Sequence, residues 1–432
     1  MKTYTEAIEY LYNRLPMFTR DGASAYKKDL DRTVALCRSL DNPQHKFKTI
    51  HVAGTNGKGS SSHMLASIFA SAGYKTGLYT SPHLVDFRER IRINGHQIAP
   101  DFVIDFVNTQ KDLIEEIQPS FFEVTVAMAF DYFAKEQVDI AIIEVGLGGR
   151  LDSTNIISPE VSLITNIGMD HMNLLGDTIE QIAFEKAGII KSQTPVVISE
   201  SNPLTQQVFN NVASSVNAPI VYADQMFTAT CLHKDVNVQH IQVKQANNIH
   251  NYDLDLTGGY QLKNVVGVLC AVNELQNLGY TIEEEHIEFG LSHVQTLTGL
   301  QGRWQTISNN PLIICDTGHN EDGIKEVINN LNDVKFNNLH IVIGAMKDKD
   351  LSHMLPYLPK TAHYYFTQPD MPRAMSASEL ANMANSLGLT GKICGSVING
   401  LTHAKEQYGE NDLIFVGGSN FVVAEILQSI QK

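Results

Sequence analysis

The first half of the chain shows short, continuous apolar runs separated by stretches with helical spacing. These runs lie at residues 49–53, 141–143, 161–165 and 196–198. Strands that are apolar on both faces are typical of a mainly parallel sheet covered by helices. Residues 225–260 alternate more between apolar and polar positions, notably at residues 228–231 and 236–239, which predicts a small antiparallel excursion.

A second βα series follows in the C-terminal part of the chain. Its apolar runs lie at residues 312–315, 339–343, 363–366 and 413–416. Residues 296–302, which are rich in Thr, Gly and Gln, have the composition of a linker. We therefore expect two α/β domains, residues 1–297 and residues 298–432.

Composition excludes several classes of protein. The 432 residues are 43% hydrophobic, which excludes a mainly disordered chain. The net charge of −15 argues against binding a nucleic-acid polymer or an anionic membrane. No apolar stretch approaches the roughly 20 residues of a membrane-spanning helix, and residues 1–6 do not begin a signal peptide. Five cysteines without a C-x-x-C pair indicate reduced thiols and a cytoplasmic location.

The strongest chemical motif is a glycine-rich loop between a predicted strand and a predicted helix. The loop consists of Gly54, Thr55, Asn56, Gly57, Lys58, Gly59 and Ser60, and we expect Gly73 to end the helix. Backbone N–H groups of such a loop bind phosphate oxygens, and Lys58 and the helix N-terminus add positive charge. The G-x-x-G-K-G-S spacing differs from the standard Walker form, so a glycine-rich turn with a stray lysine remains the alternative.

Further polar residues come directly after predicted strands. Glu144 follows residues 141–143, His171 comes after residues 161–165, and Ser81 follows a short strand at residues 76–79. The carboxyl ends of parallel strands border the crevice in which such sheets bind ligands. Glu144 suits Mg²⁺, and the hydroxyl of Ser81 suits a metal or phosphate. The alternatives are a solvated strand-end acid, a structural histidine and an ordinary Ser-Pro turn.

Three arginines alternate along the chain after Ser81. Arg88, Arg90 and Arg92 are two residues apart, so a strand would place all three side chains on one face. Such a basic face suits an anionic ligand, although a solvated strand face has the same pattern.

Together, these motifs resemble the folylpolyglutamate synthase/dihydrofolate synthase branch of the Mur ligases. Residues 51–60, 80–84, 144–150 and 170–171 occur in the family's order. The similarity continues through residues 184–189, 302–303, 316–320 and 347–350 and covers roughly residues 20–420.

The resemblance implies an α/β fold with an N-terminal P-loop ATPase-type parallel-sheet domain and a C-terminal Rossmann-like ligase domain. Residues 1–297 would bind ATP and pterin or folate. The implied enzyme is an ATP-dependent, ADP-forming amide ligase that acts through an acyl phosphate. It would join L-glutamate to dihydropteroate and add further glutamates to tetrahydrofolates, as a cytoplasmic monomer.

The resemblance also assigns residues to the site. It gives Ser81, Glu144 and His171 to two Mg²⁺ ions and allows a monovalent cation. Lys186, which the residue pattern alone would place on a helix surface, matches a lysine carboxylated by CO₂. The implied catalytic residues are Lys58, Lys186, His171 and His319. Outside the loop, the implied ATP contacts are Asn264, Arg303 and Asp316. The implied acceptor-site residues are Phe121, Phe122, Glu123, Leu151, Asp152 and Ser153.

Two segments depart from the family pattern, and related functions stay open. Residues 316–321 read Asp-Thr-Gly-His-Asn-Glu, where the family usually has Ala before the His and often Pro after the Asn; residues 20–23 also differ. The alternatives are a folate-extending enzyme without the dihydropteroate step, a peptidoglycan-precursor ligase, which normally has an additional N-terminal domain, and a P-loop NTPase switch without a small-molecule acceptor.

Overall fold

The computed structural model describes residues 1–25, 27–347, 349 and 351–430, apart from the side chains of residues 19 and 23. The chain forms two compact units. The first contains Met1–His233, His240–Asp255 and Gln261–Gly299, and the second contains Lys234–Gln239, Leu256–Tyr260 and Leu300–Lys432.

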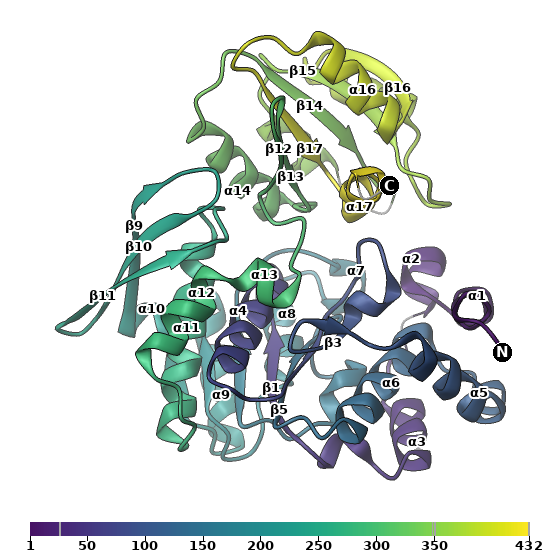
Figure 1. Cartoon of the computed structure of the whole chain (residues 1–432), viewed down its shortest axis with the longest axis vertical. Helices are drawn as coiled ribbons and strands as arrows, with labels where there is room; N and C mark the ends of the chain where they lie inside the picture. Colours follow the sequence, from purple (N-terminus) through teal and green to yellow (C-terminus); the bar gives the residue numbers. More distant parts are fainter. Residues whose placement is uncertain (26, 348, 350, 431–432) are drawn as a thin grey trace. The chain divides into compact units, whose positions relative to one another are not determined.

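The first unit is built on a sheet with strand order β4-β3-β2-β5-β1-β6-β7-β8 (Figure 1). The strands are β1 (Lys48–Ala53), β2 (Thr76–Tyr79), β3 (Ile91–Ile93), β4 (His96–Gln97), β5 (Ile140–Glu144), β6 (Val161–Ile164), β7 (Val196–Ile198) and β8 (Ile220–Tyr222). From β2 to β8 all neighbours are parallel, whereas β3 and β4 pair antiparallel at the edge. All five positions of β5 are buried, as expected for a strand covered on both faces.

Helices cover both faces of this sheet. On one face, α4 (Lys58–Ser71) and α11 (Gln261–Asn277) pack on the strands, with α12 (Glu284–Ser292) and α13 (Val294–Thr298) against α4. Gly73 follows the end of α4 with φ +85°, as predicted for a residue that ends the helix.

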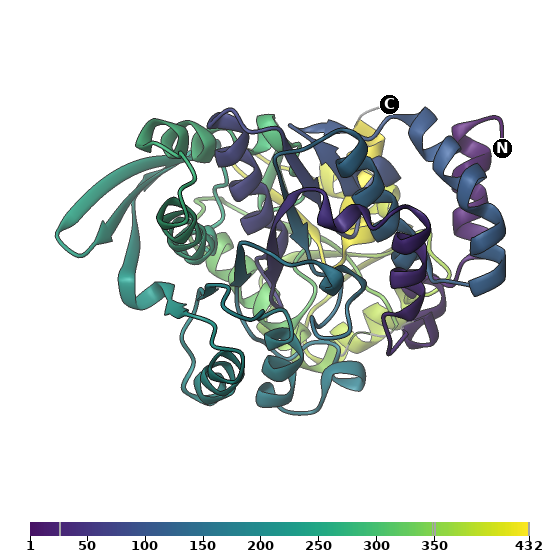
Figure 2. The same ribbon diagram turned by 90° about the horizontal axis from the view of Figure 1, so that it is seen from below.

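The other face carries two further groups of helices. Ala141 and Ile143 of β5 point into a core shared with α1 (Tyr4–Arg14), α3 (Asp31–Ser39), α5 (Pro100–Ile117) and α6 (Phe121–Lys135). A second core joins β6 and β7 to α8 (Ile179–Ala187) and α9 (Pro203–Ser215). Figure 2 shows these layers of the unit from below.

The antiparallel excursion is present as a sheet of order β11-β10-β9. Its strands are β9 (Phe227–Lys234), β10 (Gln239–Gln245) and β11 (Asn248–Leu254). Of residues 236–239, whose alternation supports that prediction, only Gln239 lies in a strand. Asp235 Oδ1 accepts hydrogen bonds from the backbone N–H groups of Asn237 and Val238 at 2.8 and 3.0 Å, which makes this segment a turn.

The second unit has a sheet of order β12-β13-β17-β14-β15-β16. Its elements are β12 (Gln305–Asn309), β13 (Leu312–Asp316), α14 (Glu321–Asn332), β14 (Leu339–Gly344), β15 (His363–Gln368), α15 (Ala377–Ser386), β16 (Gly391–Ser396), α16 (Val397–Gln407), β17 (Leu413–Gly417) and α17 (Asn420–Ile430). The four predicted apolar strands are confirmed as β13, β14, β15 and β17, which pair in parallel. The apolar pattern does not reveal the edge strands, because β12 has no buried residue and β16 is largely exposed. The predicted fold class, two α/β domains with parallel sheets, is confirmed.

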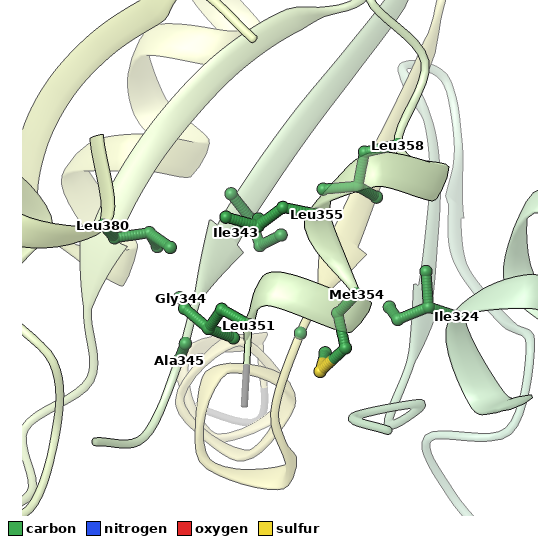
Figure 3. A pocket seen from close by; sticks show the side chains of 10 residues that line it. Ile324, Ile343, Gly344, Ala345, Leu351, Met354, Leu355, Leu358 and Leu380 are labelled. Carbon is green, nitrogen blue, oxygen red and sulfur yellow. The ribbon is translucent and has the colours of Figure 1, made fainter. Parts of the chain in front are cut away.

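An apolar pocket lies inside this second unit (Figure 3). It is lined by residues such as Ile324, Ile343, Leu351, Leu355 and Leu380, which belong to the hydrophobic core of the unit. Since every residue lining it is apolar or glycine, it has no side chain that could bind a phosphate or carboxylate.

None of the helices in the described part of the chain has the length and apolar character needed to cross a membrane.

Candidate functional site

The glycine-rich loop lies between the end of β1 and the start of α4. Gly54 has φ +150° and Gly57 has φ +86°. A Cβ atom at Gly54 would overlap the Thr165 hydroxyl, and one at Gly57 would overlap Oδ1 of Asn264. Both positions therefore require glycine, and the loop has the strand-to-helix context of a phosphate-binding loop.

Residues at the end of β6 hold this loop in place. The backbone N–H of Thr55 donates to the Asn166 carbonyl at 2.8 Å, and that of Asn56 donates to Asn166 Oδ1 at 2.7 Å. The Thr165 hydroxyl donates to the Asn56 carbonyl at 2.6 Å. Sequence reasoning gave Thr165 and Asn166 no role, although their position after a strand parallel to β1 was the available signal.

Two lysines converge on the first residue of the loop. Lys58 Nζ donates to the carbonyl oxygens of Gly54 at 3.0 Å and Thr55 at 3.1 Å. Lys186, from the last turn of α8, donates from Nζ to the same Gly54 oxygen at 2.9 Å. The expectation of a surface lysine is wrong, because Lys186 is only 4% exposed.

The surroundings of Lys186 change its charge. Burial lowers the pKa of its ammonium group to about 7, and the nearby charge of Lys58 acts in the same direction. Near pH 7, Lys186 is therefore a neutral amine in a large fraction of the molecules. A neutral amine is the form that attacks CO₂ to give a carbamate, so the residue fits the carboxylation that the resemblance implies.

Ser81 and Glu144 lie together at the ends of β2 and β5. The Ser81 backbone N–H donates to Oε2 of Glu144 at 2.9 Å, and Glu144 is only 4% exposed. Among the residues that the structure describes, no group of three His, Cys, Asp or Glu side chains could by itself hold a metal ion. One carboxylate and one hydroxyl still fit Mg²⁺, which usually keeps several waters and takes phosphate oxygens as ligands.

His171 lies directly before the short helix α7 (Met172–Leu175) with φ +51°. Its backbone N–H donates to Oδ1 of Asp170 at 2.8 Å, and its ring meets the Phe18 ring edge-on with centroids 5.6 Å apart. Its side chain is 29% exposed, so the imidazole is open to a ligand.

The predicted acceptor-site phenylalanines begin α6. Phe121 is buried and packs on the rings of Tyr12 and Phe87, with centroids 5.5 and 5.8 Å apart. Phe122 packs on Tyr79 and lies directly against Gly146, where a Cβ atom would overlap its ring. Phe122 therefore brings the start of α6 against the segment that follows Glu144.

The two predicted acceptor-site carboxylates already have protein partners. Glu123 Oε2 accepts from the Ser120 N–H at 2.6 Å and completes the cap of α6. Asp152 accepts from the backbone N–H groups of Leu147 at 2.8 Å and Thr154 at 3.0 Å. Burial raises the pKa of both carboxyl groups. Leu151 and Ser153 flank Asp152, with Leu151 half-buried and Ser153 buried.

The three predicted ATP contacts outside the loop lie in different units. Asn264, on α11 in the first unit, contacts Gly57 and donates from Nδ2 to Gln261 at 2.8 Å. Gln261 in turn donates to the hydroxyl of Ser60 at 3.1 Å, so α11 is tied to the loop. Arg303 and Asp316, like the predicted catalytic His319, belong to the second unit.

Within the second unit, Asp316 ends β13 and organises the segment around it. Its carboxylate accepts from the hydroxyl of Tyr260 and the backbone N–H groups of Trp304 and Gly318, each at 2.7 Å. Burial raises the pKa of this carboxyl group. The next residue, Thr317, accepts a hydrogen bond from Arg303 through its hydroxyl, and its carbonyl contacts Nδ1 of His319 at 2.9 Å.

The predicted basic strand is wrong. Arg88 and Arg90 belong to the 3₁₀ helix η3 (Phe87–Arg90), and only Arg92 lies in β3. Asp86 caps η3 through the N–H of Arg88, which imposes a helical turn before the strand.

The segment at residues 347–350 also resembles the family. Within it, Asp348 and Asp350 lie outside the described residues.

Comparison with known proteins agrees with this arrangement. Residues 52–272 match the Mur ligase middle domain, and residues 302–420 match the glutamate ligase domain of Mur ligases. The chain is 31% identical to the dihydrofolate synthase/folylpolyglutamate synthase of Bacillus subtilis, with 99% of each chain covered. It is 33% identical to the folylpolyglutamate synthase of Lacticaseibacillus casei, over 86% of this chain and 87% of the relative.

Solved structures show the same similarity over the whole chain. Escherichia coli FolC in complex with DHPP and ADP superimposes with a TM-score of 0.87 and 28% identity, over 100% of this chain and 98% of that one. Mycobacterium tuberculosis folylpolyglutamate synthase complexed with ADP gives a TM-score of 0.89 and 28% identity, over 99% and 98%.

A phosphate loop on a parallel sheet, followed by a second α/β unit, defines an ATP-dependent ligase of the Mur type. Within that class, the chain belongs to the dihydrofolate synthase/folylpolyglutamate synthase family. The predicted family is thereby confirmed.

Proposed function

We propose that the chain joins L-glutamate to dihydropteroate and adds further glutamates to tetrahydrofolates, with ATP converted to ADP and phosphate. The observation that carries the proposal is the convergence of Lys58 and Lys186 on the Gly54 carbonyl, which sets a neutral amine beside a phosphate loop. Family membership supplies the folate and ATP chemistry.

The reaction needs ATP because a carboxylate does not react with an amine at neutral pH. Phosphorylation of the acceptor carboxylate gives an acyl phosphate, whose leaving group is phosphate rather than oxide. The loop N–H groups and Lys58 hold the phosphates of ATP while the terminal phosphoryl group is transferred. The amine of L-glutamate then attacks the acyl carbon, and phosphate leaves.

The metal sites are part of the proposal. Ser81, Glu144 and His171 would hold two Mg²⁺ ions, which would supply positive charge against the negative charge of the phosphates. A carboxylated Lys186 would add a negative ligand beside the loop, and a monovalent cation would bind in addition to the two Mg²⁺ ions.

The division of the chain also carries functional meaning in this proposal. Residues 1–297 bind ATP and the acceptor through Asn264, Phe121, Phe122, Glu123 and the Leu151, Asp152 and Ser153 turn. Residues 298–432 supply the ligase domain with Arg303, Asp316 and His319. We propose that the enzyme acts as a monomer in the cytoplasm.

Replacement of Lys58 tests the phosphate-loop assignment. We expect Lys58→Ala to lose nearly all release of phosphate in the presence of dihydropteroate, L-glutamate and ATP. Lys111→Ala, at an exposed i,i+4 pair with Glu115, is a matched control and should keep wild-type turnover. Near-normal phosphate release by Lys58→Ala would contradict the assignment.

One relative favours a narrower second candidate. The Lacticaseibacillus casei protein is named folylpolyglutamate synthase alone. An enzyme of that kind would turn over with tetrahydrofolate and fail with dihydropteroate, so assaying each acceptor separately distinguishes the two functions.

A further inference from the structure

Arg90 is a buried cation in an unusual setting. It is only 6% exposed, and no Asp or Glu of the described residues forms an ion pair with it. Its guanidinium group lies over the Phe121 ring, 5.3 Å from the centroid, and its Nε donates to Nδ1 of His83 at 2.7 Å. Burying a cation is costly unless it is compensated, so this arrangement calls for a reason.

The bond to Arg90 fixes the orientation of the His83 ring. An arginine Nε only donates, so Nδ1 of His83 must accept and Nε2 carries the ring proton. Nε2 lies 3.2 Å from the hydroxyl of Tyr12, which takes that proton as an acceptor. The ring is therefore held from both sides, by η3 through Arg90 and by α1 through Tyr12.

His83, held by Arg90 and Tyr12, lies two residues after the proposed metal ligand Ser81. His83 follows Ser81 and Pro82 in one turn, and the Ser81 backbone donates to Glu144 at the other end of that turn. The negative charge of Glu144 also acts on the Arg90 cation. The turn is thus fastened at one end by Glu144 and at the other by Arg90 through His83.

We propose that Arg90 is a positioning residue for the magnesium site: through His83 it fixes the turn in which the Ser81 backbone N–H donates to the Glu144 carboxylate. The inference rests on the proposed function, which assigns Ser81 and Glu144 to Mg²⁺. Residues that orient metal ligands typically change metal affinity by about 10- to 100-fold when they are replaced.

Arg90→Lys separates geometry from charge, because lysine keeps the cation and loses the Nε donor and the planar fork. The measurement is ADP binding by calorimetry, with Mg²⁺ and with EDTA, together with the Mg²⁺ concentration that gives half-maximal ADP release. We expect a rise of about tenfold or more in the Mg²⁺ requirement, with ADP binding in EDTA unchanged. Arg88→Gln is the control, since Arg88 lies in the same helix and pairs with Asp86.

Two further variants make the outcome decisive. Tyr12→Phe removes only the far hydroxyl and should raise the Mg²⁺ requirement less than Arg90→Lys does. An unchanged Mg²⁺ requirement in Arg90→Lys, or an equal loss of ADP binding in EDTA, overturns the role of Arg90. Ser81→Ala tests the metal site itself: no effect there contradicts the proposed function, whereas an effect there and none in Arg90→Lys overturns the inference alone.

Discussion

Lys186 Nζ donates to the carbonyl oxygen of Gly54 at 2.9 Å, across 132 positions of sequence. The contact brings the last turn of α8 to the phosphate loop. It also removes the amine from water, which lowers the pKa of Lys186 to about 7. The residue is therefore buried against the loop instead of forming a surface ion pair, as its proposed carboxylation by CO₂ requires.

Lys186→Ala should be inactive, because it removes the amine that the proposed function converts to a carbamate. Short carboxylic acids should restore part of the ADP release, since they supply a carboxylate in the space that the side chain leaves. Lys191→Ala, which removes a neighbouring half-buried lysine, should stay active and gain nothing from the acids. Full activity of Lys186→Ala without added acid would contradict the carbamate.

The lowered pKa of Lys186 also predicts a pH dependence of stability. Between about pH 7 and the pKa of a free lysine near 10.4, the unfolded chain binds more protons than the folded one, so this group makes stability rise with pH. Lys186→Met should flatten the rise by about 1 kcal/mol per pH unit. Urea unfolding of both proteins at pH 7 and pH 9 measures the difference, and parallel pH profiles would show that the amine is not neutral in the fold.

Gly57→Ala should abolish nucleotide binding, because Gly57 has φ +86° and a Cβ atom there would overlap Asn264. Gly73 provides a matched control at the other end of α4: its φ is +85°, and a Cβ atom there meets nothing within 4 Å. Gly73→Ala should cost only about 1 kcal/mol of backbone strain and keep ADP affinity. Calorimetry measures the ADP affinity of both variants. Equal affinities would contradict the assignment of the loop as the phosphate-binding site.

Asp316→Asn should destabilise the second unit. The carboxylate accepts three hydrogen bonds, and an amide would turn a donor toward one of these donors. We expect the free energy of unfolding to fall by about 1–3 kcal/mol in a urea titration. Asp333→Asn, at a side chain 58% exposed, should change it little. A loss of ATP affinity without loss of stability would instead mark Asp316 as a nucleotide contact alone.

The sequence predicted the elements whose signal is local. Continuous apolar runs identified the parallel strands, and glycine spacing identified the phosphate loop. The prediction that Arg88, Arg90 and Arg92 share a strand is wrong, because the cap at Asp86 imposes a helical turn that the alternating pattern does not reveal. The edge strand β16 was not predicted, because its largely exposed residues have no apolar pattern.

The contacts that build the site join residues far apart in sequence, so the spacing of residues along the chain does not predict them. Lys186 has the local sequence of a helix-surface residue, and only the packing of α8 on the loop buries it. Asn166 and Arg90 likewise contact distant segments, Asn166 at the loop N–H of Asn56 and Arg90 at the Phe121 ring. Family resemblance located Lys186, whereas its burial and the lowered pKa of its amine required the structure.

ADP release against a panel of pterin and folate acceptors tests the central claim most directly. The account predicts that ADP forms only when ATP, L-glutamate and a suitable acceptor are all present, in proportion to the glutamate that is joined. ADP release at the same rate without acceptor or glutamate would contradict it and would favour a nucleotide-hydrolysing switch.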